Sequence, residues 1–297
     1  MTEEESRELK NSIFAAQQAA QGGLPMVQGM AVQNTAQAAK QAIGFDLPVA
    51  EVPLPSRGLV YPDGPLHMVE TVEIRPMTAR EEDILMNRTL VRKGTVVTEL
   101  IKSCIINKNI DVNSMISGDR NALMVAVRIT GYGADYAPKV TCPACEVQQD
   151  WSLNLENLPV KDLDLSKLKQ VGPGQNAFEF LLPLSKKTVV FKFLTGREEE
   201  RMLQDIEARR KKGIVQENLV TTKLMNSIAS IEGNSERGFI NQFCQYMPAR
   251  DSLALRKVMD EAEPGIDMSS DFTCTSCGHQ EVIAVPLGAS FFWPNAR

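Results

Sequence analysis

The 297-residue sequence has little histidine, no excess of positive charge and no long run of apolar residues. Its two histidines, His67 and His279, leave almost no material for Ser–His–Asp hydrolase triads or for His-rich catalytic metal sites. Lysine and arginine total 32 against 37 aspartate and glutamate, which gives a formal net charge of −5. Broad binding to nucleic-acid phosphates needs a basic face, so this balance disfavours nucleic acid as a partner.

The hydrophobic pattern also argues against a membrane span and a secretory signal. No stretch approaches the roughly 18 apolar residues of a transmembrane helix. The first ten residues, MTEEESRELK, are acidic where a signal peptide would be basic. We therefore expect no membrane partner. Hydrophobic residues make up 43% of the chain, enough to bury a core, and the length predicts about two domains.

Residues 1–50 differ in composition from the rest of the chain. The stretch from Asn11 to Gly44 is rich in alanine and glutamine and carries few charges. Such a segment has too few large apolar residues to close a core, and arms of this kind are usually ordered by wrapping a partner. We predict an extended N-terminal arm over residues 1–50 that contacts neighbouring subunits.

Residues 51–160 form a first predicted α+β unit. After a proline-rich opening, a strand is predicted from Met68 to Arg75, and Thr78 with Glu81 forms a capping box at the start of a helix. Two further helices are predicted, one from an apolar stripe and one from an aspartate N-cap: Val96 to Ile105, and Asp119 to Gly131.

The same order recurs in residues 161–297. Val189, Phe191 and Phe193 alternate in a predicted strand, and Thr195 with Glu198 forms a second capping box 117 positions after the first. An apolar helical stripe and a second aspartate N-cap follow: Leu224, Met225, Ile228 and Ile231, then Asp251 with Leu253, Leu255 and Met259. The aspartates are 132 positions apart, as are the cysteine pairs below. We therefore predict a tandem pseudo-repeat of strand–helices–C-x-x-C–strand units.

Four of the six cysteines form two C-x-x-C pairs, Cys142 with Cys145 and Cys274 with Cys277. A threonine precedes each pair and alternating apolar residues follow it: Trp151, Leu153 and Leu155 after the first, and Ile283, Val285 and Leu287 after the second. The alternation predicts strands, so each pair lies on a turn that leads into a strand, as in a zinc knuckle. Two such turns supply four sulfurs, enough for one zinc-ribbon-like site that joins the two units.

Other uses of these cysteines stay open from the sequence. Iron also binds sites made of four cysteines, and disulfides would require an oxidising compartment. A dithiol redox pair usually lies at a helix N-terminus, where the helix dipole lowers the thiol pKa. His279, two residues after Cys277, is an alternative ligand. We expect structural Zn²⁺ held by Cys142, Cys145, Cys274 and Cys277, with no catalytic residue, because four protein ligands leave no open position for substrate.

The remaining cysteines and the aromatic tail are interpreted as packing features. Cys104 and Cys244 lie in apolar helical stretches, where we expect them to be small buried hydrophobes. Phe291, Phe292 and Trp293 are costly to leave in water, so they either pack on the ribbon or anchor a neighbouring subunit.

Four segments carry a resemblance to a known family: LPSRGLVYP (54–62), VEIRPMTAREEDILMNR (72–88), GYGADY (131–136) and CPAC (142–145). In this order they resemble the T4-type bacteriophage baseplate hub protein family over roughly residues 50 to 155. The resemblance implies a non-enzymatic component or assembly factor of a contractile tail baseplate, with other baseplate and tail proteins as partners. The implied location is the virion tail, and the host cytoplasm during assembly. The arm and the long second unit depart from the family pattern, so a hub and a neighbouring wedge position both stay open.

Two other functions are weighed against this structural one. A zinc-ribbon nucleic-acid-binding protein would use the same four cysteines but is disfavoured by the acidic balance. A C-x-x-C dithiol redox protein would need one cysteine to titrate as a thiolate of low pKa.

Overall fold

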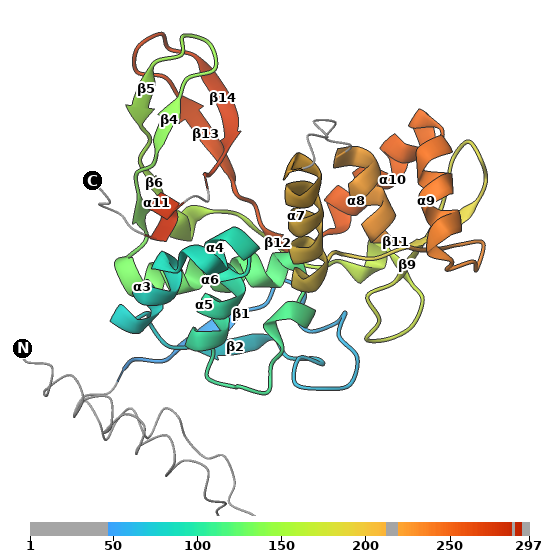
Figure 1. Ribbon diagram of the computed structural model, residues 1–297, viewed down its shortest axis with the longest axis horizontal. Helices are drawn as coiled ribbons and strands as arrows, with labels where there is room; N and C mark the ends of the chain where they lie inside the picture. Colours follow the sequence, from blue (N-terminus) through green and yellow to red (C-terminus); the bar gives the residue numbers. More distant parts are fainter. Residues whose placement is uncertain (1–46, 212–218, 287–288, 293–297) are drawn as a thin grey trace, which may run out of the picture. The chain divides into compact units, whose positions relative to one another are not determined.

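The computed structural model describes residues 47–211, 219–286 and 289–292 (Figure 1). Helices and strands both contribute, which confirms the predicted α+β class. The predicted arm lies outside the described residues except for 47–50, and Trp293 lies outside them too. Within the described ranges, every helix is too short or too polar to cross a membrane.

The described chain begins with an antiparallel hairpin of β1 (Ala50–Pro53) and β2 (Thr71–Ile74). Val52, Val72 and Ile74 face the core and are almost fully buried, as the two-residue period of a strand requires. The strand predicted from Met68 is shorter than expected. Met68 adopts a φ of 54° in the loop between the strands, a turn conformation that a strand cannot contain.

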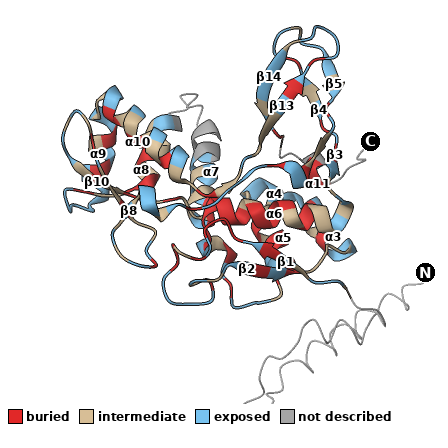
Figure 2. Ribbon diagram, turned by 180° about the vertical axis from the view of Figure 1, so that it is seen from behind, coloured by how far each residue is buried: buried red, intermediate tan, exposed pale blue. Residues whose placement is uncertain are grey.

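Four helices follow the hairpin: α3 (Ala79–Met86), α4 (Arg88–Lys93), α5 (Val96–Cys104) and α6 (Ser117–Tyr132), with a short 3₁₀ turn at Val112–Ser114 before α6. The capping box predicted from Thr78 and Glu81 is confirmed. Its carboxylate accepts a hydrogen bond from the Thr78 N–H at 2.9 Å. The predicted stripe of α5 is confirmed as well, and Figure 2 shows much of the buried surface on α5 and α6.

The N-cap role predicted for Asp119 is wrong. Helix α6 begins two residues earlier, at Ser117, and Asp119 lies in its first turn. The fully buried carboxylate accepts hydrogen bonds from the Ser56 N–H (3.0 Å) and from the Tyr61 hydroxyl (2.6 Å). It therefore ties α6 to the long loop between β1 and β2, a tertiary contact that local capping patterns do not reveal.

The second half contains a four-stranded antiparallel sheet in the order β11-β10-β9-β8. Its strands are β8 (Lys169–Gln170), β9 (Phe178–Leu181), β10 (Thr188–Phe191) and β11 (Ile228–Ile231). Phe178 and Phe191 are fully buried in the sheet, and the ring of Phe193 lies 4.9 Å from that of Phe178. The predicted strand residues Val189 and Phe191 are confirmed, whereas Phe193 follows the end of β10.

Four helices accompany this sheet: α7 (Gly196–Lys211), α8 (Leu219–Ser227), α9 (Arg237–Tyr246) and α10 (Ala249–Ala262). The helical stripe predicted through Ile228 and Ile231 is wrong, because α8 ends at Ser227 and the next residues form β11. Ile231 is paired with Val189 of β10, so strand pairing decides the conformation of this short apolar run.

The N-cap role predicted for Asp251 is wrong in the same way. Helix α10 begins at Ala249, and the buried Asp251 lies in its first turn. Its carboxylate accepts hydrogen bonds from the N–H groups of Leu184 (2.7 Å) and Ser185 (2.9 Å), in the turn between β9 and β10.

Short strands and close backbone contacts join the two halves. The strand pair that crosses is β7 (Val160–Lys161) with β12 (Gly265–Ile266). Within the first half, β3 (Asp135–Tyr136) pairs with β6 (Leu153–Asn154), and 3₁₀ turns follow at Leu155–Asn157 and Leu165–Lys167. The Ser117 N–H donates to the Leu194 carbonyl at 2.9 Å. A Cβ on Gly118 would lie 1.7 Å from the carbonyl oxygen of Pro264, so only glycine permits this approach.

A buried ion pair fixes the start of α3 against β2 and α5. The Arg75 guanidinium donates two hydrogen bonds to the Glu81 carboxylate, at 2.8 and 3.1 Å, and the Ser103 hydroxyl donates a third at 2.6 Å. Burial alone would raise the pKa of Glu81. The hydrogen bonds from Arg75, Ser103 and Thr78 outweigh burial and hold this pKa well below its ordinary range.

We predict that Glu81→Gln lowers the free energy of unfolding by about 2–4 kcal/mol, because it leaves the Arg75 charge partly buried without its partner. Chemical denaturation measures this change, with Glu261→Gln as control. Glu261 and Lys257 are both largely exposed, so the control should cost less than about 1 kcal/mol.

The pH dependence has a defined sign. A carboxyl with a lowered pKa stabilises the fold above its unfolded pKa of about 4.3 and loses that contribution as the pH falls further. The difference between wild type and Glu81→Gln should therefore shrink below about pH 4. Equal stability of the two proteins at pH 7 would contradict the assignment.

Candidate metal centre

Two antiparallel hairpins carry the paired cysteines. The strands β4 (Lys139–Thr141) and β5 (Gln148–Asp150) flank Cys142 and Cys145, and β13 (Ser269–Thr273) and β14 (Gln280–Ala284) flank Cys274 and Cys277. The hairpins lie side by side in both views (Figures 1 and 2). The predicted turn before a strand is confirmed for both pairs.

The strands that follow the turns are shorter than the sequence predicts. After the first pair, β5 ends at Asp150 and β6 begins at Leu153, so Trp151 lies between two short strands. After the second pair, β14 ends at Ala284 before Val285, and Leu287 lies outside the described residues.

The two turns have the same backbone hydrogen bonds. The Cys142 N–H donates to the Val147 carbonyl at 3.0 Å, and the Glu146 N–H returns to the Cys142 carbonyl at 2.9 Å. In the second turn the Cys274 N–H donates to the His279 carbonyl at 2.8 Å, and the Gly278 N–H donates to the Cys274 carbonyl at 3.0 Å. The residue after each second cysteine has a positive φ, 58° at Glu146 and 72° at Gly278, which bends the chain back into the following strand.

The four sulfurs converge on one point. Their Sγ atoms all lie within 4.8 Å of one another. Two close contacts cross between the hairpins: Cys142 to Cys277 at 3.8 Å and Cys145 to Cys274 at 3.6 Å. A tetrahedron of sulfurs about 2.3 Å from a central zinc has edges of about 3.8 Å, so the spacing is compatible with a metal site. It is far longer than a disulfide bond of about 2.05 Å.

The four thiols differ in their burial and in the hydrogen bonds that shift their pKa. Cys142 and Cys274 are buried, whereas Cys277 is exposed. The N–H groups of Cys277 and Ser276 lower the pKa of Cys274 to about 6. The Val147 N–H acts in the same direction on Cys145, but contacts with the Cys277 and Cys142 thiols raise its pKa to about 12. The pKa of Cys274 therefore lies well below that of Cys145, and a divalent cation at the centre would favour the thiolate form at all four positions.

His279 does not join the four sulfurs in the cluster of potential ligands found among the described residues. Its Nε2 lies 3.2 Å from a carboxylate oxygen of Glu281, on the exposed side of β14. The sequence-based alternative of a histidine ligand is not favoured by this position.

Side chains of the first hairpin hold the second hairpin in register. The Trp151 Nε1–H donates to the Asp271 carbonyl at 3.2 Å, and its ring meets Phe272 edge-on at 6.1 Å. The Gln149 amide donates to the Thr273 carbonyl at 3.1 Å and accepts from the Thr275 N–H at 2.9 Å. The roles of Gln149 and Phe272 could not be predicted from the sequence, because their partners lie more than 100 positions away.

The aromatic tail packs at the base of the hairpins. Helix α11 (Ala289–Phe292) buries Phe291 and Phe292, and the Phe291 ring lies 5.3 Å from that of Tyr136. The buried Arg128 donates to the Phe291 carbonyl at 2.6 Å. Phe291 and Phe292 therefore do not anchor a neighbouring subunit, which was the alternative left open by the sequence, because their side chains are already covered within the chain.

The remaining cysteines behave as predicted. Cys104 and Cys244 are buried in helices, and burial raises their pKa to about 12 and about 11, respectively. A thiol with so high a pKa carries almost no thiolate at neutral pH, so neither residue is a reactive nucleophile.

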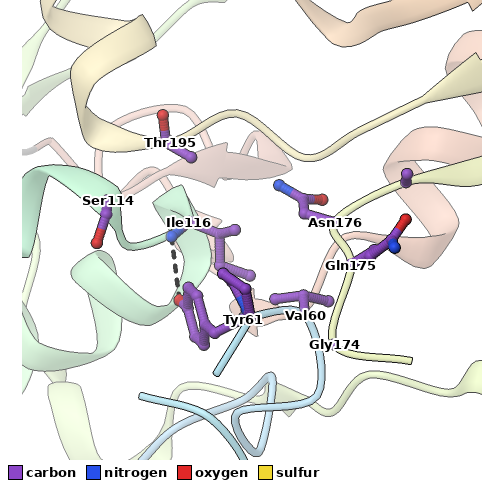
Figure 3. Close-up of a pocket in the computed structure, with 10 residues that line it drawn as sticks. Val60, Tyr61, Ser114, Ile116, Gly174, Gln175, Asn176 and Thr195 are labelled. Carbon is purple, nitrogen blue, oxygen red and sulfur yellow. Dashed lines mark hydrogen bonds between the residues drawn. The ribbon is translucent and has the colours of Figure 1, made fainter. Parts of the chain in front are cut away.

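A cavity of about 330 Å³ lies elsewhere, between the loop after β1 and the segment before β9 (Figure 3). The polar groups that line it are largely paired inside the protein. The Tyr61 hydroxyl accepts from the Ile116 N–H at 3.1 Å and donates to Asp119, and the Asn176 amide bonds both backbone groups of Phe193. This cavity offers few groups to orient a ligand, so the four-cysteine cluster is the stronger candidate site.

Comparison with known proteins finds a family match. A family model described as "T4 bacteriophage base plate protein" matches residues 54–293, which include both cysteine pairs. No curated protein and no solved structure is matched. The resemblance to baseplate proteins inferred from residues 50 to 155 is thereby confirmed, and it extends through the second half of the chain.

We predict that Trp151→Phe costs about 1–2 kcal/mol of unfolding free energy, because the Asp271 carbonyl loses its donor while the aromatic contact is kept. Thermal or urea unfolding measures the cost. The control is Gln148→Ala on the exposed side of β5, which should change stability by less than about 0.5 kcal/mol. A larger effect at Gln148 than at Trp151 would show that the hairpins are not docked through Trp151.

Proposed function

The chain belongs to the T4 bacteriophage base plate protein family, and we propose that it is a structural component or assembly factor of a contractile tail baseplate, at or beside the hub. The family match over residues 54–293 carries this proposal. The protein would act in the virion tail after passing through the host cytoplasm during assembly. Its partners would be neighbouring baseplate and tail proteins.

The proposal includes a structural Zn²⁺ at Cys142, Cys145, Cys274 and Cys277. The support is the mutual spacing of the four sulfurs, within 4.8 Å, on two turns of matching geometry. Four thiolates would complete a tetrahedral coordination sphere and leave no position for water or substrate. Zinc would therefore stabilise the docking of the hairpins and would not take part in catalysis. We propose that the protein is not an enzyme.

The alternative functions have less support. Thiol chemistry of the thioredoxin type uses a C-x-x-C at a helix N-terminus, whereas both pairs here lie on turns between strands. Nucleic-acid binding by the hairpins would need basic and aromatic side chains at their tips. The exposed residues between the cysteines are Pro143 and Ala144 in the first turn and Thr275 and Ser276 in the second.

We also infer that residues 51–160 and 161–297 are copies of one ancestral unit. The element order β1-β2-α3-α5-α6-β4-β5 corresponds to β9-β10-α7-α8-α10-β13-β14. Matching interactions support this inference. Glu81 and Glu198 both accept from the N–H of a threonine three residues earlier, and each pairs with a cation six residues earlier, Arg75 or Lys192.

The buried aspartates support the duplication as well. Asp119 and Asp251 both occupy the first turn of a helix, and each accepts hydrogen bonds from the segment after a matching strand, β1 for Asp119 and β9 for Asp251. That segment begins with Leu54 and Pro55 in the first half and with Leu182 and Pro183 in the second. The zinc site would need both copies, so we expect them to fold as one cooperative unit.

We predict one zinc per purified chain by elemental analysis. Chelation of the metal, or Cys274→Ser, should lower the thermal midpoint by roughly 10 °C or more, since each kcal/mol corresponds to about 2–4 °C in a unit of this size. The control is Cys244→Ala, which removes a buried sulfur outside the cluster and should keep the zinc. A metal-free Cys274→Ser protein with full thermal stability would rule out a structural metal, and bound iron would replace zinc in the proposal.

A second prediction concerns the arm, which we propose contacts neighbouring subunits. Limited proteolysis of the free chain should cleave within residues 1–50 first, and the same sites should be protected in assembled particles, because a low-complexity arm gains order from a partner. Mass spectrometry of the fragments gives the result. Resistance of the arm in the free chain, or equal cleavage in the particle, would contradict it.

A further inference from the structure

Helix α9 carries two apolar stripes. Ile240 and Cys244 form the inner stripe and are buried against the rest of the second half. Phe239, Phe243 and Tyr246 follow the spacing i, i+4, i+7 and share a second flank of the helix. Phe239 is 40% exposed and Tyr246 is 79% exposed, while Phe243 is half-buried. The core covers the first stripe and part of Phe243, and it leaves Phe239 and Tyr246 at the two ends of the second stripe exposed among the described residues.

The first half makes the corresponding connection without such a helix. Between Ile105, which pairs with β2, and α6 it has only the 3₁₀ turn Val112–Ser114. The second half inserts the ten residues of α9 between β11 and α10. Because the first half makes this connection without a helix, the outer aromatic flank of α9 (Phe239, Phe243 and Tyr246) is a feature of the second half alone.

The chain segment that carries this flank is uncharged, although Glu236, Arg237 and Arg250 stand at its two ends. From Gly238 to Ala249 there is no Asp, Glu, Lys or Arg, and the exposed polar residues are amides: Asn241, Gln242 and Gln245. A segment that binds along these residues desolvates amides and no charge of α9 between Gly238 and Ala249, which lowers the cost of burying this polar surface. The chemistry fits a partner that is itself uncharged and rich in amides and small apolar groups.

The chain contains such a segment. Residues 11–39 carry no charged side chain, and alanine and glutamine make up 14 of the 29 residues, with interspersed apolar residues such as Phe14 and Val27. Helix α9 is about 15 Å long, so one of its faces offers much less than the roughly 800 Å² that each partner buries in a stable interface between globular proteins. A single extended or helical segment is the kind of partner that one helix flank can hold.

The arm joins the described unit at β1, which packs against β2 and α6. Helix α9 packs against a different pair, α8 and β11. Strand β1, where the arm begins, and α9 share no neighbouring element. We therefore assign the segment that binds α9 to a second copy of the chain. We propose that the outer aromatic flank of α9 binds residues 11–39 of a neighbouring copy of this chain. The inference deepens the proposed arm-mediated assembly and rests on it.

The test places a photo-crosslinking amino acid at position 246 of the full-length chain and mixes it with an isotopically heavy, unmodified full-length copy. We expect light-to-heavy crosslinks from position 246 to residues 11–39. Crosslinks within one copy, crosslinks to another region and the absence of crosslinks would each overturn the proposal. Proteolysis of the assembled particle tests arm contacts of any kind. If the arm is protected there but these crosslinks are absent, the proposed function stands and α9 is not the surface that binds the arm.

A second measurement uses self-association of the full-length chain by analytical ultracentrifugation. The double variant Phe239→Ser/Tyr246→Ser should weaken association at least tenfold, while circular dichroism and the thermal midpoint stay close to those of the wild type. The matched control is Leu253→Ser, an apolar residue of α10 that is 60% exposed. Equal association of the double variant and the wild type, or equal losses in the double variant and the control, would overturn the proposal.

Discussion

The convergence of four sulfurs from two distant turns is the constraint on which the rest of the structure depends. The sulfurs in closest cross-hairpin contact belong to residues 135 and 129 positions apart, so neither half supplies more than two of them. The four sulfurs can meet only if each half holds its hairpin in a fixed position relative to the other hairpin. Tertiary contacts meet that requirement: Trp151 and Gln149 align the hairpins, and the strand pair β7–β12 joins the segment after the first hairpin to the segment before the second.

Arg128 shows how the base of this arrangement is held. The fully buried guanidinium donates to the carbonyls of Gly133 (2.6 Å), Asp135 (3.1 Å) and Phe291 (2.6 Å). Burial lowers the pKa of Arg128, yet three carbonyl acceptors and the Tyr132 ring at 5.5 Å compensate for the lost hydration. One side chain thus connects the end of α6, strand β3 and helix α11. This is also why the aromatic tail belongs to the scaffold.

Local signals in the sequence predicted the local features of the fold. The capping boxes at Thr78 and Thr195 depend on residues three positions apart, and the C-x-x-C turns on residues close in the chain, so both were visible without tertiary structure. Asp119 and Asp251 were predicted to cap the N-termini of their helices, whereas both accept hydrogen bonds from distant segments. Their donors, such as Ser56 and Leu184, lie 63 and 67 positions away, and a cap was the only local explanation for a buried aspartate near a helix start.

The sequence by itself determined the α+β class, the two cysteine pairs, the baseplate family and the metal-ligand chemistry that four thiols make possible. Each of these follows from composition, short spacing or ordered motifs. Only the tertiary structure decided that the four sulfurs meet, that Ile228 to Ile231 form a strand, that Phe291 is buried and that α9 exposes aromatic side chains. Those outcomes depend on which surfaces are brought together in space, because strand pairing and burial are decided by partners that the local sequence does not contain.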